Sequence, residues 1–115
     1  MKHKPIMKKM FILSIAAMAL AAWSAQAEDA KAIYDHSCAM CHGADGKGQT
    51  KMGQKLGAKD YTDPKVQAAL TDEAAIKAIK EGVEDKDGKT VMRPEKNLSD
   101  SDIKDVVAYL RTFKQ

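Results

Sequence analysis

Cys38-Ala39-Met40-Cys41-His42 stands at the end of a segment with helical periodicity. Small or apolar side chains recur there at the spacing of one helix face, at Ala30, Ile33, Tyr34, Ser37, Cys38 and Cys41. The motif therefore closes a first predicted helix. Three glycines within residues 43–48 follow it and predict a turn-rich loop, in which the backbone can pass close to another group.

Two cysteines separated by two residues and followed directly by histidine form the attachment site of c-type haem. One helical turn bridges two neighbouring pyrroles, so that each sulfur can add to one vinyl group of the porphyrin. The histidine that follows immediately can swing its imidazole beneath the iron. We therefore predict one covalent haem c per chain, attached through Cys38 and Cys41 and ligated by His42.

Three other interpretations of the motif have less support. A disulfide between Cys38 and Cys41 would close a very short loop and contribute little entropy. A thioredoxin-like pair needs a βαβ setting, and the ten residues from Glu28 to Ser37 are too few to supply one. A zinc site needs further Cys or His ligands, and beyond the motif residues 28–115 offer only His36.

Loop structure is expected to continue from the motif to Thr62. Asp63-Pro64 then predicts an N-cap and a proline in the first helical position, which opens a short helix through about Leu70. Thr71 predicts the cap of another helix, which Gly82 ends. Both helices are short and amphipathic.

The last helix has the clearest signal in the chain. Ser99 and Asp102 form a capping box at its start. One apolar face follows, made of Ile103, Val106, Val107 and Leu110 and extended by Phe113. Since no segment alternates with period two for long enough to predict a strand, we expect an all-α domain of three to five short helices with long loops.

The N-terminal 27 residues differ in composition from the rest. They contain four lysines and no acidic residue, a largely apolar run from Met10 to Trp23, and small residues at Ala25 and Ala27. This is the plan of a cleaved secretory signal, and a run of 14 residues is shorter than the ~20 that span a bilayer. We expect cleavage after Ala27 and a mature domain over residues 28–115.

The mature domain has little net charge and a small core. The signal holds four of the 19 basic residues, which leaves 15 basic against 16 acidic residues, a net charge of −1. Nucleic-acid binding would need a basic excess, so it is not expected. Eighty-eight residues rich in alanine bury only a modest core, and a large apolar cofactor would fill it.

From Asp29 to Phe113 the chain resembles a class I bacterial cytochrome c. The resemblance rests on CAMCHG after a helix, the loop ADGKGQTKMGQKLGAKDYTD, and the final TVMRPEKNLSDSDIKDVVAYLRTF, in that order. It implies the cytochrome c fold, wrapped around one covalent haem, with the first and last helices crossing and packing together. Ile33 and Tyr34 would then contact the face formed by Val106, Val107 and Leu110.

The sixth iron ligand has more than one candidate. Met40 lies between the two attached cysteines and is excluded, which leaves Met52 and Met92. The resemblance favours Met92, because Met92-Arg93-Pro94 matches the Met-x-Pro ligand loop of the family, where proline stiffens the loop. Met52 could instead pack on the porphyrin, and His36 is a third candidate. For the propionates, the loop offers only Tyr61 and Lys59.

With His42 and Met92 on the two axial positions, no site stays open for oxygen or peroxide. We therefore expect a one-electron carrier of the periplasm and not an enzyme. It would be a monomer that exchanges electrons with redox partner proteins and, once the signal is removed, does not contact a membrane.

Lysines recur every fourth residue in the loop, at Lys47, Lys51, Lys55 and Lys59. They could steer an acidic partner to the haem edge or simply form a solvated loop. Two other functions are alternatives to the electron carrier. One is a haem-based sensor or peroxidase-like enzyme in which Met92 detaches, and the other is a thiol oxidoreductase without haem.

Overall fold

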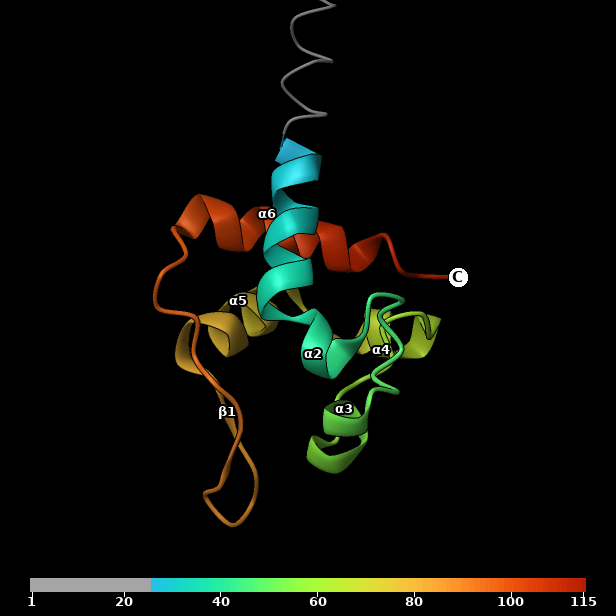
Figure 1. The fold of residues 1–115 in the computed structure, drawn as a ribbon, viewed down its shortest axis with the longest axis vertical. Coiled ribbons are helices and arrows are strands. Elements are labelled where there is room, and N and C mark those ends of the chain that lie inside the picture. The colour runs from blue at the N-terminus through green and yellow to red at the C-terminus, as the bar shows by residue number, and fades with distance from the viewer. Residues whose placement is uncertain (1–25) are drawn as a thin grey trace, which may run out of the picture.

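The structure is a computed structural model that describes residues 26–115 (Figure 1). The expected signal, residues 1–27, lies outside the described residues except for its last two. The described elements are a first helix over residues 26–37, α2 (Ala39–His42), α3 (Lys51–Leu56), α4 (Pro64–Ala69), α5 (Asp72–Glu81), β1 (Val83–Glu84), β2 (Thr90–Met92) and α6 (Asp100–Arg111).

The first helix ends in the cysteine motif, as its periodicity predicts. A turn at Cys38 separates it from α2, and Gly43 ends α2 by donating its N–H to the carbonyl of Ala39. Because of this interruption, residues 26–115 contain six helical segments, one more than the upper limit of the prediction.

The expected loop from the motif to Thr62 is partly wrong, because it contains α3. The side chain of Thr50 accepts the N–H of Gly53 at the start of this helix, and Gly57 ends it in the left-handed conformation. A Thr cap and a glycine stop were both visible in the sequence. The six residues between them are too few to show a periodicity.

The other helices begin and end where their capping residues predict. Asp63 caps α4 with proline in its first turn, and Thr71 caps α5, which Gly82 ends. At the start of α6, Ser99 and Asp102 exchange the two hydrogen bonds of a capping box. These side chains satisfy helix N–H groups that would otherwise lack partners.

The absence of any strand from the prediction is a second error. β1 and β2 form an antiparallel hairpin in which Val83 pairs with Met92 and Glu84 with Thr90. At its tip, the carboxylate of Asp85 accepts backbone N–H groups from Asp87 and Lys89. Strands of two and three residues are too short for an alternation that sequence analysis can detect. The domain is nevertheless all-α in class, with this small ribbon added.

The first helix crosses α6, and the two pack together as expected (Figure 1). Ile33 packs against one core cluster, and Tyr34 belongs to a second one together with Tyr61 and Leu110. The first cluster consists of Ala75, Ile79, Ile103, Val106 and Val107, so it joins α5 to α6. Burying side chains such as Ile103 stabilises the fold by about 1.5–3 kcal/mol each.

A buried glutamine ties α4 to α6 at the other end of the domain. The Nε2 group of Gln67 donates to the carbonyls of Tyr61 and Leu110, each at 2.8 Å. Its Oε1 accepts a hydrogen bond from Arg111, also at 2.8 Å. All the polar atoms of this buried amide group therefore have partners, which avoids the cost of burying them unpaired.

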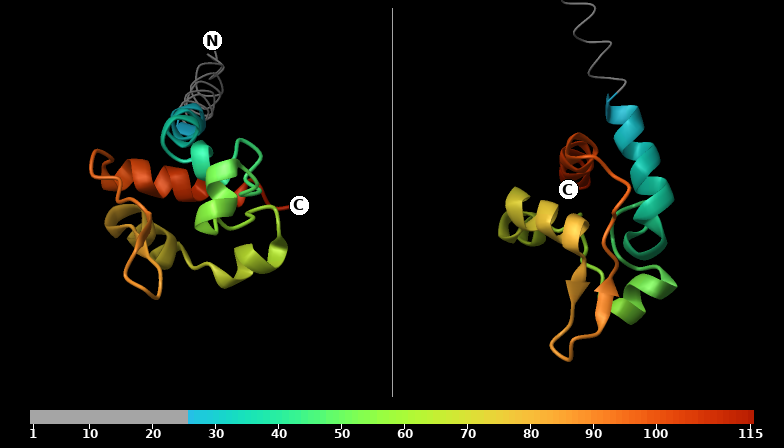
Figure 2. Two further views of the ribbon diagram at one scale, coloured as in Figure 1. Left: turned by 60° about the horizontal axis from the view of Figure 1, so that its bottom comes forward. Right: turned by 90° about the vertical axis from the view of Figure 1, so that its left-hand side faces the viewer.

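The hairpin and α3 lie on the side of the molecule away from α6 (Figures 1 and 2). Residues of both elements line one cavity, described below. None of the helices within residues 26–115 has the length and apolar character needed to cross a membrane.

Candidate functional site

A cavity of about 630 Å³ opens between α2, α3, α5, the hairpin and α6. Its walls are largely apolar and include Leu56 from α3, Ile79 from α5, and Val106 and Leu110 from α6. Sites for small molecules and cofactors have volumes of about 300–1,000 Å³. The cavity is therefore large enough for a macrocycle.

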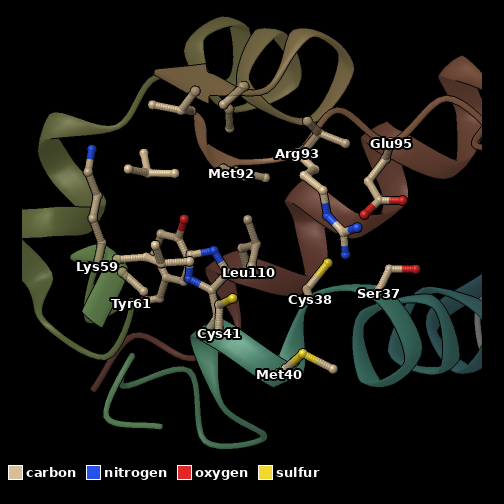
Figure 3. Close-up of a pocket in the computed structure, with 18 of the residues that line it drawn as sticks. Ser37, Cys38, Met40, Cys41, Lys59, Tyr61, Met92, Arg93, Glu95 and Leu110 are labelled. Carbon is tan, nitrogen blue, oxygen red and sulfur yellow. The ribbon is translucent and has the colours of Figure 1, made fainter. Parts of the chain in front are cut away.

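The structure places all three residues of the predicted attachment site on this cavity. Cys38, Cys41 and His42 line it from the turn and helix of the motif. Figure 3 shows the two cysteines. Both cysteines are half-buried free thiols. Burial raises the pKa of the Cys38 thiol to about 11, and the carboxylate of Glu95 contributes to the same shift.

The His42 imidazole is in an apolar setting that favours its neutral form. Burial lowers the pKa of His42, and the nearby backbone of Lys59 offsets part of this shift. The Nδ1 atom of this imidazole is buried and has no hydrogen-bond partner in the described part of the chain. The ring stacks at a tilt on Tyr61, with 5.0 Å between the ring centroids. A neutral imidazole is the form that ligates a metal.

The short helix α3 and its capping residue contact the backbone carbonyls of the cysteine motif. The Thr50 hydroxyl lies 2.7 Å from the carbonyl oxygen of Met40 and 2.9 Å from that of Cys41, and its one proton is shared between these two acceptors. Gly53 abuts the carbonyl of Cys41 so closely that a Cβ atom there would clash with it. Sequence analysis missed this contact. The one feature of the sequence that points to this contact is Gly53, because glycine is unfavourable inside a helix unless close packing requires it.

All three candidates for the sixth ligand line the same cavity, but from different places. Met92 ends β2, is half-buried, and packs against the core cluster of α5 and α6. In Figure 3 it lies across the cavity from Cys41. Met52 is 40% exposed on α3, and His36 is exposed on the first helix, two residues before Cys38.

Polar groups gather at parts of the cavity wall. Lys59, Tyr61, Arg93 and Glu95 all line it (Figure 3). Tyr61 is buried, and burial raises the pKa of its phenol. Lys59 and Tyr61 are the two residues that the loop offered for propionate contacts, and the structure brings both to the cavity.

The residues present fit a covalently bound haem. Two thiols and an imidazole stand on one side of a macrocycle-sized apolar cavity, and thioethers are available to complete the coordination. The imidazole has a buried nitrogen without a partner among the described residues, and its environment disfavours a charged ring. A helical domain with this arrangement defines a c-type haem protein.

The chain belongs to the cytochrome c family, because the sequence model described as Cytochrome c matches residues 27–114. It is therefore a haem-binding electron-transfer protein, and its cofactor is covalently attached haem c. This confirms the family and the all-α fold expected from the sequence, and the CxxCH cysteines of the chain are Cys38 and Cys41.

Solved structures of c-type cytochromes are similar to the chain. "KustC0563 c-type cytochrome" has 34% sequence identity and a TM-score of 0.64, and the match covers 74% of this chain and 96% of that one. A second structure, of a point mutant of Kustc0563, has 33% identity and a TM-score of 0.63, with 75% and 99% covered. A search of curated proteins finds no match.

Proposed function

We propose that the chain is an exported one-electron carrier whose haem is attached through Cys38 and Cys41 and ligated by His42 and Met92. The observation that carries the proposal is the cavity, which His42 lines from α2 and Met92 from β2. When bound, the haem iron supplies a one-electron couple whose potential a soft thioether ligand raises.

The placement of Met92 supports its role as the sixth ligand. Its side chain is half-buried and packs on the core, so its position is restricted by its neighbours. Pro94 fixes one backbone dihedral just beyond it. Met52 is more exposed and lies on a six-residue helix. Filling both axial positions leaves no open site, so a carrier is favoured over a sensor or an enzyme.

The composition of the N-terminus supports export to the periplasm. Cleavage after Ala27 would release residues 28–115, and the family match begins at residue 27, next to this boundary. Covalent attachment requires a compartment where the two thiols meet haem and the attachment machinery. We propose that the mature domain is a monomer without a membrane segment.

The entrance of the cavity is the proposed contact surface for redox partners. The large hydrophobic side chains exposed within residues 26–115 are Met40 at 73%, Met52 at 40% and Val83 at 38%, and all three line the cavity. Lys59 lines it too, and the exposed Lys51 and Lys55 belong to α3. Exposed apolar side chains on the cavity, with Lys59 on its wall and two more cations on α3, suit a partner with an acidic rim, which long-range attraction would steer.

Attachment and export are tested together by the intact mass of the protein recovered from an exporting host. The expected mass is that of residues 28–115 plus one haem. A mass equal to the bare peptide would overturn the proposal. Expression without export is the matched control and should give apoprotein.

The sixth ligand is tested by comparing Met92→Ala with Met52→Ala. Met92→Ala should remove the weak long-wavelength absorption band of the ferric protein, open the sixth site to CO, and lower the potential. Met52→Ala should change none of these. The opposite pattern would assign the ligand to Met52, and CO binding to the unmodified protein would favour a sensor.

A further inference from the structure

Gly82 lies at the end of α5, in direct contact with the strand that carries Met92. Its φ of 76° and ψ of −177° belong to a region that only glycine adopts readily. A Cβ atom at this position would lie 2.6 Å from the carbonyl oxygen of Met92. The same atom would lie 3.0 Å from both the nitrogen and the Cδ of Pro94. No side chain fits between α5 and the backbone of the Met-x-Pro segment.

Two backbone contacts hold the same segment against α5 on either side of that point. Val83, the next residue after Gly82, pairs with Met92 in the hairpin. Beyond the proline, the N–H of Glu95 donates to the carbonyl of Ile79 at 2.8 Å. Ile79 is itself buried in the core cluster of α5 and α6. The segment from Met92 to Glu95 therefore contacts the chain at three points, at Ile79 in the last turn of α5 and at Gly82 and Val83 just after it.

Proline alone cannot set the distance of Met92 from the iron. It fixes its own φ and restricts the residue before it, but it does not fix where the segment lies relative to the rest of the domain. That placement comes from the close backbone approach at Gly82 and from the contacts around it. A displacement there moves the backbone of Met92 and with it the thioether.

We propose that Gly82 is a positioning residue for the ligand Met92. The absence of a side chain at residue 82 lets the ligand strand lie at the depth from which the thioether reaches the iron. The proposal rests on the proposed function, in which Met92 is the sixth ligand. It adds the end of α5 as the element that determines how firmly this ligand is held.

The test uses the holoprotein and compares Gly82→Ala with Gly88→Ala. Gly88 is a matched control because it lies in the hairpin that directly follows Gly82 and has a positive φ of 78°, but a Cβ atom there would meet nothing within 4 Å. The readouts are the thioether absorption band of the ferric protein and its affinity for imidazole, which competes with Met92 for the sixth position. Thermal stability is measured alongside.

Gly82→Ala should weaken the band and raise the affinity for imidazole at least about tenfold, the scale on which one added methyl group overpacks a filled site. Gly88→Ala should leave both unchanged even where it lowers stability. Equal imidazole affinities for the two variants would overturn the proposal.

Met92→Ala distinguishes a failure of this proposal from a failure of the proposed function. If Met92→Ala binds imidazole no more tightly than the unmodified protein, Met92 is not the ligand, and both proposals fail. If Met92→Ala binds imidazole tightly and Gly82→Ala does not, only the positioning role fails.

A second variant, Glu95→Pro, tests the positioning of the same segment if Gly82→Ala gives no folded holoprotein. It removes the N–H bonded to Ile79 and should also raise the affinity, whereas an unchanged affinity would overturn the proposal.

Discussion

The phenolic oxygen of Tyr34 lies 2.6 Å from the carbonyl oxygen of Gly43 and donates a hydrogen bond to it. Tyr34 is completely buried, at 0% exposure, and its ring packs against those of Tyr109 and Phe113, which also contact each other. The bond joins the first helix to the glycine that ends the cysteine motif. It thus links the crossing of the two long helices to the start of the haem site.

Replacing Tyr34 by phenylalanine should destabilise the holoprotein by about 0.5–1.5 kcal/mol, the net contribution of one hydrogen bond, because the carbonyl of Gly43 still accepts the N–H of Gly46. Guanidinium unfolding of the holoprotein measures the change. Tyr109→Phe is the control, because the hydroxyl of Tyr109 has no hydrogen bond within residues 26–115, and it should change stability less. Equal effects of the two substitutions would show that the bond to Gly43 contributes nothing specific.

The ion pair between Lys80 and Asp100 predicts a pH-dependent link between α5 and α6. The two groups are 2.6 Å apart, and the hydrogen bond and charge of Lys80 lower the pKa of Asp100, with a smaller effect of Lys104 in the same direction. Because the folded pKa lies below the unfolded value, this contribution is complete above the unfolded pKa. It is lost as pH falls through the folded pKa.

Asp100→Asn should therefore lower the free energy of unfolding slightly at pH 7 and by less near pH 2, because protonation removes the charge that Lys80 attracts. Chemical denaturation at the two pH values measures this. Asp105→Asn, in the same helix but without an ion pair in the described residues, is the comparison. A loss for Asp100→Asn that is as large at pH 2 as at pH 7 would contradict the ionic origin.

Charge reversal at Lys55 should change the rate of electron exchange with charged reagents in opposite directions. Lys55→Glu should slow oxidation by the anion ferricyanide and speed oxidation by a cationic cobalt complex, each by severalfold at low salt. Both differences should shrink at high salt because exposed charges are screened. Stopped-flow absorbance measures the rates.

Lys114→Glu is the control, because it makes the same change of charge at a different place. Lys114 lies beyond the end of α6, whereas Lys55 belongs to α3 on the side of the molecule away from α6. Lys114→Glu should have a smaller effect on both rates. If it alters them as much as Lys55→Glu does, net charge rather than the position of Lys55 on α3 determines the rate.

The apoprotein should be poorly ordered at room temperature. Without the cofactor, a cavity of about 630 Å³ would separate the wall residues of α2, α3, α5 and α6, and unfilled volume of this kind is costly. Circular dichroism of the double variant Cys38→Ala, Cys41→Ala tests this. Full helicity and a cooperative thermal transition in that variant would show that the protein core is sufficient by itself.

Local signals in the sequence were enough to locate most of the helices. Asp63, Thr71 and Ser99 each act within three residues of the helix start that they cap, so their effect is readable from neighbouring residues. The CxxCH motif is local for the same reason, because one helical turn determines how its thiols and imidazole are spaced. The attachment site, the all-α class and the family could therefore be predicted without coordinates.

The tertiary structure decided what supports and encloses that motif. Thr50 caps α3 and reaches back to the carbonyls of Met40 and Cys41, a pairing across nine or ten residues that no periodicity reveals. The hairpin escaped prediction because strands of two and three residues are too short to show a period-two alternation.

The surroundings of Met92 show the difference most clearly. The sequence by itself determined that a methionine stands two residues before a proline, ahead of the last helix. Only the folded chain places its backbone against Gly82 and pairs it with Val83. Such a contact depends on where α5 ends in space, and that is set by packing of α5 on α6, which involves residues far apart along the chain.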